Sequence, residues 1–243
     1  MEEYIIMNLT EQGSIRSLME LTTNDDIKEA DFELDENLMF KLTKKNAEKA
    51  LKCIRNNRRY KAPSYEEYYK SQGKSLEKYT LGEWESIIRC IARANSTRTS
   101  NENIKVMAKY IFGKKDAFLN LLKSGDPKLV DEITSVTGYS RHEKSLASKV
   151  CHFLCELEYG KSDFPINDNI VRNMLPYYLN YFKIGCNGNK LENSSYQQTT
   201  SLISKVKDNL PENLTYSEID RIIWYCYRND SVRREIAIGK LRK

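Results

Sequence analysis

Two side chains in the second half of the chain have the types and the spacing for covalent chemistry. Lys149 lies in the segment SLASKV, and Asp168 follows it by 19 residues (149 to 168) in the segment FPIND. A neutral lysine amine is a nucleophile that forms a Schiff base with carbonyl carbon. A carboxylate beside a reacting carbon stabilises positive charge that develops there. A lysine and a carboxylate together could therefore attack a carbon centre and stabilise the positive charge on it.

The residues around this pair predict a helix, a turn and a second helix. Residues 127–137 predict a helix that ends at Gly138, since glycine readily adopts the left-handed conformation that closes a helix. Residues 142–158 carry apolar residues at helical spacing and predict the second helix. Asp168 stands directly before a further helix. Residues 127–173 therefore contain a complete helix–turn–helix unit together with both candidate residues.

This unit resembles the helix-hairpin-helix DNA glycosylases, and most closely the branch of 8-oxoguanine DNA glycosylase/lyases. In that branch a lysine lies early in the second helix of the hairpin, and an aspartate follows that helix after a hydrophobic-proline-hydrophobic step. Lys149, the FPI step and Asp168 match this pattern in order and in spacing, over about a fifth of the chain. The resemblance implies a two-lobed helical fold, DNA as the partner, and neither a metal nor an organic cofactor.

The resemblance also gives the two residues separate roles in excising an oxidised or modified purine. Breaking the N-glycosidic bond builds positive charge on the sugar, which Asp168 would stabilise. The amine of Lys149 would attack the anomeric carbon and form a Schiff base that leads to strand cleavage. Lysine is a nucleophile only in its neutral form, which burial or a neighbouring cation favours. Arg141 and Lys144 are the candidates for that cation.

The turn of the hairpin departs from the family's pattern. The family's turn is rich in glycine, and its backbone N–H groups bind a DNA phosphate, as at other anion sites built from glycine and helix N-termini. This chain has the run GYSRH at residues 138–142, with a single glycine. We expect Ser140, Arg141 and Lys144 to contact the phosphate instead.

Aromatic residues of the C-terminal part are the candidates for a pocket that stacks a flipped base. Tyr177, Phe182 and Trp224 are the main candidates, and Tyr178 and Tyr227 lie nearby in sequence. Aromatic residues at these spacings are also typical of a helical core. The two candidate catalytic residues also have ordinary structural interpretations. Lys149 could be a solvated surface lysine, and Asp168 could cap the helix that follows it.

Apolar residues at spacings of three and four predict helices through most of the chain. Pro176 is expected to break or kink the helix in which it lies, and the last residues, RREIAIGKLRK, form a basic tail. Strand signals are weak, so we expect an all-α, two-lobed body of about ten helices, forming one unit over residues 1–243. Apart from a helix that follows Pro165, the clearest expected helices are 37–56, 82–94, 102–112, 115–123, 127–137, 142–158, 197–208 and 216–228.

Composition limits the class of protein. The net charge of +5, from 39 basic and 34 acidic residues, permits nucleic-acid binding without demanding it. No apolar run approaches the roughly 20 residues of a membrane span, and the N-terminus lacks a signal-peptide pattern. Six cysteines without a CxxC pair, and two histidines, do not match a usual zinc or iron–sulfur site. We expect a cytoplasmic protein with no membrane contact.

Three functions fit the sequence. The first is a DNA glycosylase with lyase activity. The second is a non-catalytic DNA-binding module of the same fold, for example in mobile-element or anti-phage defence, which the altered hairpin turn favours. The third is a helical interaction protein without DNA binding. Salt-sensitive DNA binding would separate the third from the others, and activity that depends on Lys149 would separate the first from the second.

Overall fold

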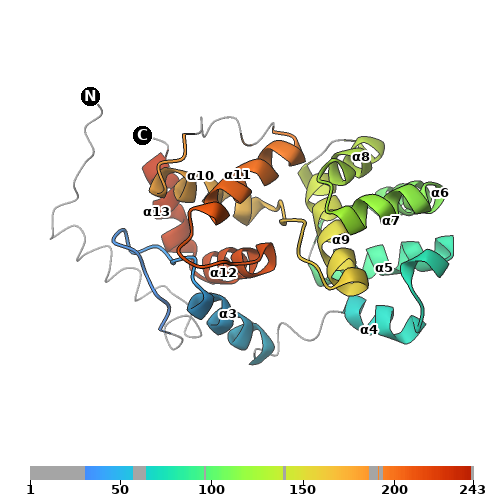
Figure 1. Cartoon of the computed structure of the whole chain (residues 1–243), viewed down its shortest axis with the longest axis horizontal. Helices are drawn as coiled ribbons and strands as arrows, with labels where there is room; N and C mark the ends of the chain where they lie inside the picture. Colours follow the sequence, from blue (N-terminus) through green and yellow to red (C-terminus); the bar gives the residue numbers. More distant parts are fainter. Residues whose placement is uncertain are drawn as a thin grey trace.

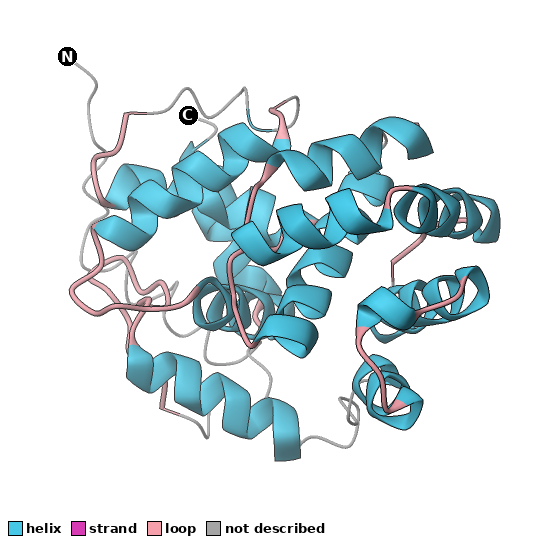
Figure 2. Ribbon diagram, turned by 45° about the vertical axis from the view of Figure 1, so that its right-hand side comes forward, coloured by secondary structure: helices cyan, strands magenta, loops and turns pink. Residues whose placement is uncertain are grey.

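Helices make up almost all of the regular structure, as Figure 2 shows for a computed structural model of the chain. The structure describes residues 31–56, 64–95, 97–138, 141–185, 191 and 194–241. These residues form 11 α-helices and no β-strand, apart from an isolated bridge between Leu34 and Phe40. The prediction of an all-α fold is confirmed.

Figure 1 labels most of the helices along the chain. From residue 82 onward the expected helices agree with the structure to one residue at each end, with the exception of α10. In chain order they are α3 (Lys44–Asn56), α4 (Ser64–Gln72), the 3-10 helix η2 (Leu76–Lys78), α5 (Leu81–Ala94), α6 (Asn101–Gly113), α7 (Lys115–Ser124), α8 (Lys128–Thr137), α9 (Arg141–Tyr159), α10 (Asn169–Tyr181), α11 (Tyr196–Asp208), α12 (Tyr216–Asn229) and α13 (Ser231–Leu241).

Two hydrophobic clusters divide the described helices into two lobes, which lie side by side in Figure 1. The central lobe holds α4 to α9 and is built around Trp84, whose ring meets Tyr79 and Phe118 edge-on at 5.7 and 5.5 Å. The terminal lobe holds α3 and α10 to α13, so it combines early and late parts of the chain. Helix α11 belongs to both, because Tyr196 packs in the central cluster and Ile203 in the terminal cluster.

Side-chain caps explain where three of these helices begin. Thr80, Ser195 and Thr215 each accept a hydrogen bond from the backbone three residues later, and the Glu or Gln at that position bonds back to the cap residue. This capping box satisfies two backbone N–H groups that would otherwise lack partners. The starts of α5, α11 and α12 therefore follow from the local sequence.

The first described helix begins later than expected, at Lys44 rather than near residue 37. The carboxylate of the buried Asp35 accepts hydrogen bonds from the backbone of Asn37 at 2.8 Å and of Met39 at 2.9 Å. Leu38 between them has a positive φ of 63°, which interrupts a helix. The apolar spacing that suggested a longer helix comes instead from a tight turn that buries Met39.

Of the two expected effects of Pro176, a break of the helix is not found, because α10 continues past the proline to Tyr181. Proline removes one backbone donor from a helix interior, but the next turn is held by tertiary contacts. The hydroxyl of Tyr177 donates to Asp35 at 2.5 Å, and that of Tyr178 donates to the carbonyl of Phe40 at 2.7 Å. These buried contacts keep the chain helical beyond the proline.

The expected basic tail is mostly a helix, α13. Arg233 is buried and donates from Nε to Asp230 at 2.8 Å, and its guanidinium lies 4.8 Å from the ring centre of Phe40. This ion pair and cation–π contact attach α13 to the terminal lobe. None of the helices that the structure describes is both long enough and apolar enough to cross a lipid bilayer.

Candidate functional site

Lys149 and Asp168 meet in the structure. The Nζ atom of Lys149 lies 3.5 Å from Oδ2 of Asp168, and the two residues are only 5% and 7% exposed. Lys149 comes from the middle of α9 in the central lobe, whereas Asp168 directly precedes α10 in the terminal lobe. The pair therefore forms a buried ion pair between the two lobes, rather than a solvated lysine and a separate cap.

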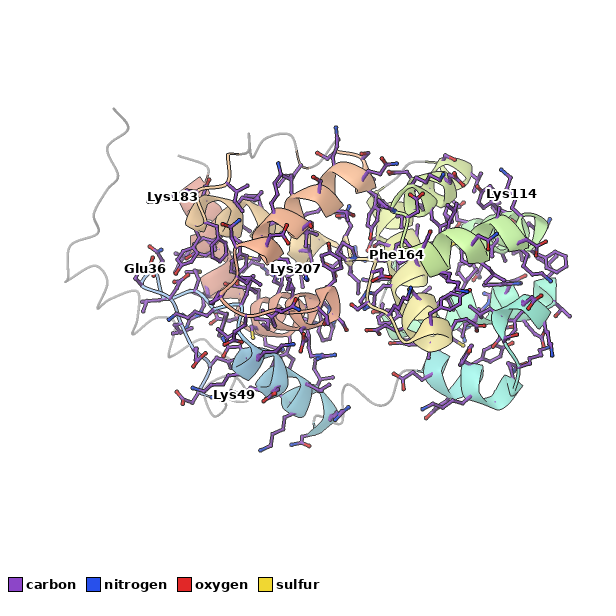
Figure 3. All side chains as sticks on the ribbon, in the orientation of Figure 1. Glu36, Lys49, Lys114, Phe164, Lys183 and Lys207 are labelled. Carbon is purple, nitrogen blue, oxygen red and sulfur yellow. The ribbon has the colours of Figure 1, made fainter. Side chains whose placement is uncertain are left out.

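The segment between α9 and α10 is fixed to α9 on both sides of Lys149. The backbone N–H of Asn167 donates to Oγ of Ser148 at 3.0 Å. One turn further along α9, Nδ1 of the buried His152 lies 2.6 Å from the carbonyl oxygen of Phe164. Phe164 itself is buried in the central cluster and lies between the two groups of helices in Figure 3. These contacts set the path that brings Asp168 back to Lys149.

The two oxygens of Asp168 have separate tasks. Oδ1 accepts hydrogen bonds from the backbone of Ile170 at 2.9 Å and Val171 at 3.0 Å, and so caps α10. Oδ2 is the oxygen that faces Lys149. A carboxylate at a helix N-terminus is further stabilised by the helix dipole. Asp168 is therefore both the expected cap of α10 and the ion-pair partner of Lys149.

Asp220 on α12 is a functional candidate that the sequence analysis missed. Its Oδ1 atom is buried and has no hydrogen-bond partner among the described residues. Burial first, and then the negative charge of Asp168, raise the pKa of Asp220 to about 8, while Lys149 and Arg221 act in the opposite direction. At neutral pH this carboxyl group is mostly protonated. In sequence it looks like an ordinary polar position of an amphipathic helix, so no signal distinguished it.

A small apolar cavity adjoins this group. Its walls include Asp220, Tyr178, Ile166 and Val171, and the last two lie two residues before and three residues after Asp168 in the chain. Its volume of about 10 Å³ is roughly the space of one water molecule. A nucleobase does not fit in it without movement of the surrounding helices.

The three expected phosphate-binding residues are placed differently. Ser140 lies outside the described residues, and Arg141 is the first residue of α9, where only the backbone is described. Lys144 donates from Nζ to the carbonyl of Ser194 at 2.8 Å, so it bonds to the segment before α11. Burial lowers the pKa of Lys144, which Asp131 partly offsets. Its ammonium group is thus already engaged within the protein.

The expected base-stacking residues take part in the packing of the terminal lobe. Tyr177 is buried and bonds to Asp35, as described above. Phe182 is half-buried and meets Tyr181 edge-on at 5.0 Å, and Trp224 is half-buried with the guanidinium of Arg228 4.8 Å from its ring centre. Of the aromatic residues considered, Tyr178 is the one that shares a cavity wall with Asp220.

The cysteines that the structure describes are free thiols, and three of them are buried: Cys151, Cys155 and Cys226. Burial raises the pKa of all three thiols. Across the described ranges, no three His, Cys, Asp or Glu side chains are grouped so that they could hold a metal ion.

Comparisons of this chain with models of protein families, with curated proteins and with solved structures found no match.

Proposed function

We propose that this protein is a DNA base-excision enzyme: a glycosylase with Schiff-base lyase activity on an oxidised or modified purine such as 8-oxoguanine. The observation that supports this proposal is the buried Lys149–Asp168 pair, with Nζ and Oδ2 3.5 Å apart. A nucleophilic amine and a carboxylate at this separation can both reach one sugar carbon. Asp168 then stabilises the positive sugar as the glycosidic bond breaks, and Lys149 attacks its anomeric carbon.

The proposal requires the site to open when DNA binds. Both residues are nearly inaccessible, and the adjoining cavity holds about one water molecule. The pair lies between the lobes, so a small separation of α10 and α12 from α9 would admit an extruded nucleotide. Extrusion of the target base is how enzymes of this chemical class reach their substrate.

DNA as the partner and a cytoplasmic location belong to the same proposal. The formal net charge of +5 suits a polyanionic partner. Buried free thiols such as those of Cys151 and Cys155 suit a reducing compartment, where disulfides are rare.

Borohydride trapping tests this function. The purified protein is incubated with duplex oligonucleotides that contain either 8-oxoguanine or an abasic site, and borohydride reduces any Schiff base to a stable protein–DNA bond. We expect a covalent band with both substrates that is absent in Lys149→Gln. The matched control is Lys109→Gln, which removes an exposed lysine from α6 and should leave the band unchanged.

The same samples distinguish the other functions. Salt-sensitive DNA binding without a covalent band on either substrate would indicate a non-catalytic DNA-binding module rather than an enzyme. Absence of both binding and the band would leave a helical interaction protein. A band that persists in Lys149→Gln would show that another amine is the nucleophile.

A further inference from the structure

We propose that Asp220 is a third member of this site and is the acid that gives a proton to the departing base. This inference rests on the proposed function and adds a residue to it. Neither the resemblance nor the spacing of Lys149 and Asp168 points to α12.

The contacts of α12 place Asp220 near the segment that leads to Asp168. The start of α12 is tied to the segment that leads to Asp168, because the backbone N–H of Ser217 donates to Oγ of Ser162 at 2.8 Å. One turn into α12, Asp220 shares the wall of the small cavity with Ile166 and Val171, which flank Asp168 in the chain. A side chain at this place lies close to the segment that carries Asp168, and its carboxyl group interacts electrostatically with Asp168 and with Lys149.

The charges around Asp220 come from three elements. Lys149 and Glu156 on α9, Asp168 at the N-terminus of α10 and the neighbouring Arg221 on α12 all act on it electrostatically. Behind these, Nε2 of His152 lies 3.7 Å from Glu156, and burial lowers the pKa of that imidazole. Two carboxyl groups beside a single lysine cannot both be charged at low cost. Asp168 has the lysine and two backbone donors, so Asp220 keeps the proton.

The carboxyl group of Asp220 is incompletely hydrogen-bonded. Oδ1 of Asp220 is buried without a partner in the described part of the chain, which costs free energy in the resting protein. Active sites often keep a carboxyl group in this condition so that it can act as an acid at neutral pH. A base nitrogen next to it would supply the missing acceptor.

The proposed steps balance in protons and electrons. When the glycosidic bond breaks, its electron pair goes to the base nitrogen, which takes the proton from Asp220, and the sugar cation is stabilised by Asp168. The new carboxylate of Asp220 then takes a proton from the ammonium group of Lys149. The lone pair freed on Nζ forms the bond to the anomeric carbon. Asp220 ends the sequence protonated, and no external acid is consumed.

Asp220→Asn separates this role from a structural one. Asparagine keeps the size and neutrality of the protonated acid but has no acidic proton. We expect release of 8-oxoguanine to fall about 100-fold or more, the usual contribution of an acid catalyst. Trapping on a preformed abasic site should change less than about threefold, because no base has to leave. Asp208→Asn, an exposed position at the end of α11, is the control and should leave both rates unchanged.

A pH profile of base release gives the second measurement. The wild-type rate should fall as the pH rises through about 8, where Asp220 loses its proton, and the residual rate of Asp220→Asn should lack this fall. Normal base release by Asp220→Asn would overturn the inference about Asp220. Trapping by the wild type would still support the proposed enzymatic function. Equal loss of base release and abasic trapping in a folded variant would also overturn it, since Asp220 would then position Lys149. If the wild type traps neither substrate, the proposed function fails, and this inference fails with it.

Discussion

Ser148 holds Asn167 through a buried hydrogen bond of 3.0 Å, so the residue before Lys149 is attached to the residue before Asp168. The hydroxyl of Ser148 also donates to the carbonyl of Ser145 at 3.0 Å, which fixes its orientation within α9. Together with the contact between His152 and Phe164, this side chain therefore helps to set the distance between the two candidate catalytic groups without being either of them.

Ser148→Ala should loosen the site. The variant leaves the buried N–H of Asn167 without its acceptor, which costs about 1–3 kcal/mol of the free energy of unfolding. Urea unfolding measures this loss. We also expect trapping on abasic DNA to fall, since Asp168 is no longer held at its distance from Lys149.

Ser86→Ala is the control for this effect. The Ser86 hydroxyl donates only to the carbonyl of Gly82 in its own helix and leaves no buried group unpaired. Its free energy of unfolding should change by less than about 0.5 kcal/mol, as for most surface substitutions. Equal behaviour of the two alanine variants would mean that the Ser148–Asn167 bond does not position the site.

The buried ion pair makes a prediction that does not depend on function. Asp168→Asn keeps an oxygen that can cap α10 but removes the charge that faces Lys149. Loss of the carboxylate that pairs with this buried ammonium group should lower the free energy of unfolding by up to about 3–5 kcal/mol, less the part that ionisation of Asp220 restores. The double variant Lys149→Met/Asp168→Asn should recover most of this loss, because no buried charge remains.

A double-mutant cycle by urea unfolding measures the coupling between the two residues. Additive effects of the single variants would contradict a direct pair. They would mean that Lys149 and Asp168 are each stabilised by other groups.

The local signals in the sequence were enough for most of the fold. Apolar spacing identified α5 to α9 because each of these helices buries one continuous face, and Gly138 marked the end of α8 through its positive φ of 100°. The sequence did not predict the turn at Asp35, because the apolar spacing there also fits a helix. The hydrogen bonds that Asp35 accepts from the backbone stabilise the turn instead. Tertiary contacts across many residues also decided the course of α10 beyond Pro176, and no local pattern contains them.

The site was only partly predictable for the same reason. Lys149 and Asp168 are joined by one short connection, so their spacing along the chain carries information about their spacing in space. Asp220 lies 52 residues after Asp168 (168 to 220), and the packing of α12 brings it into the wall of the small cavity with Ile166 and Val171. The aromatic candidates could not be sorted by sequence, because stacking on a base and packing in a core require the same residue types.

Tyr177→Phe tests the structural role that the fold gives to this aromatic residue. Its hydroxyl donates to the buried Asp35 at 2.5 Å. Losing a hydrogen bond to a charged group should cost about 1.5–3 kcal/mol of unfolding free energy without changing base release per folded molecule. Tyr181→Phe is the matched control, since its hydroxyl contacts the exposed Glu36 at 3.2 Å. Normal stability together with reduced base release in Tyr177→Phe would instead support a role of Tyr177 in the base pocket.

The protonation of Asp220 predicts how stability depends on pH. Its pKa is about 8 in the folded protein and about 4 in the unfolded chain, so between these pH values the folded state binds a proton that the unfolded state releases. Stability therefore falls as the pH rises from about 4 to about 8, and this contribution levels off above that range. Asp220→Asn carries no titrating proton and lacks this fall.

Relative to the wild type, the variant should gain stability between pH 5 and pH 8. The pKa of Asp220 is raised by more than one unit, so the gain should exceed about 1 kcal/mol. Urea unfolding of both proteins at the two pH values measures it, with Asp208→Asn as a control that should show no such gain. A difference that stays constant with pH would mean that Asp220 has the same charge in the folded and unfolded states. In that case the carboxyl group would be an ordinary anion at neutral pH, and the proton needed by a departing base would have to come from elsewhere.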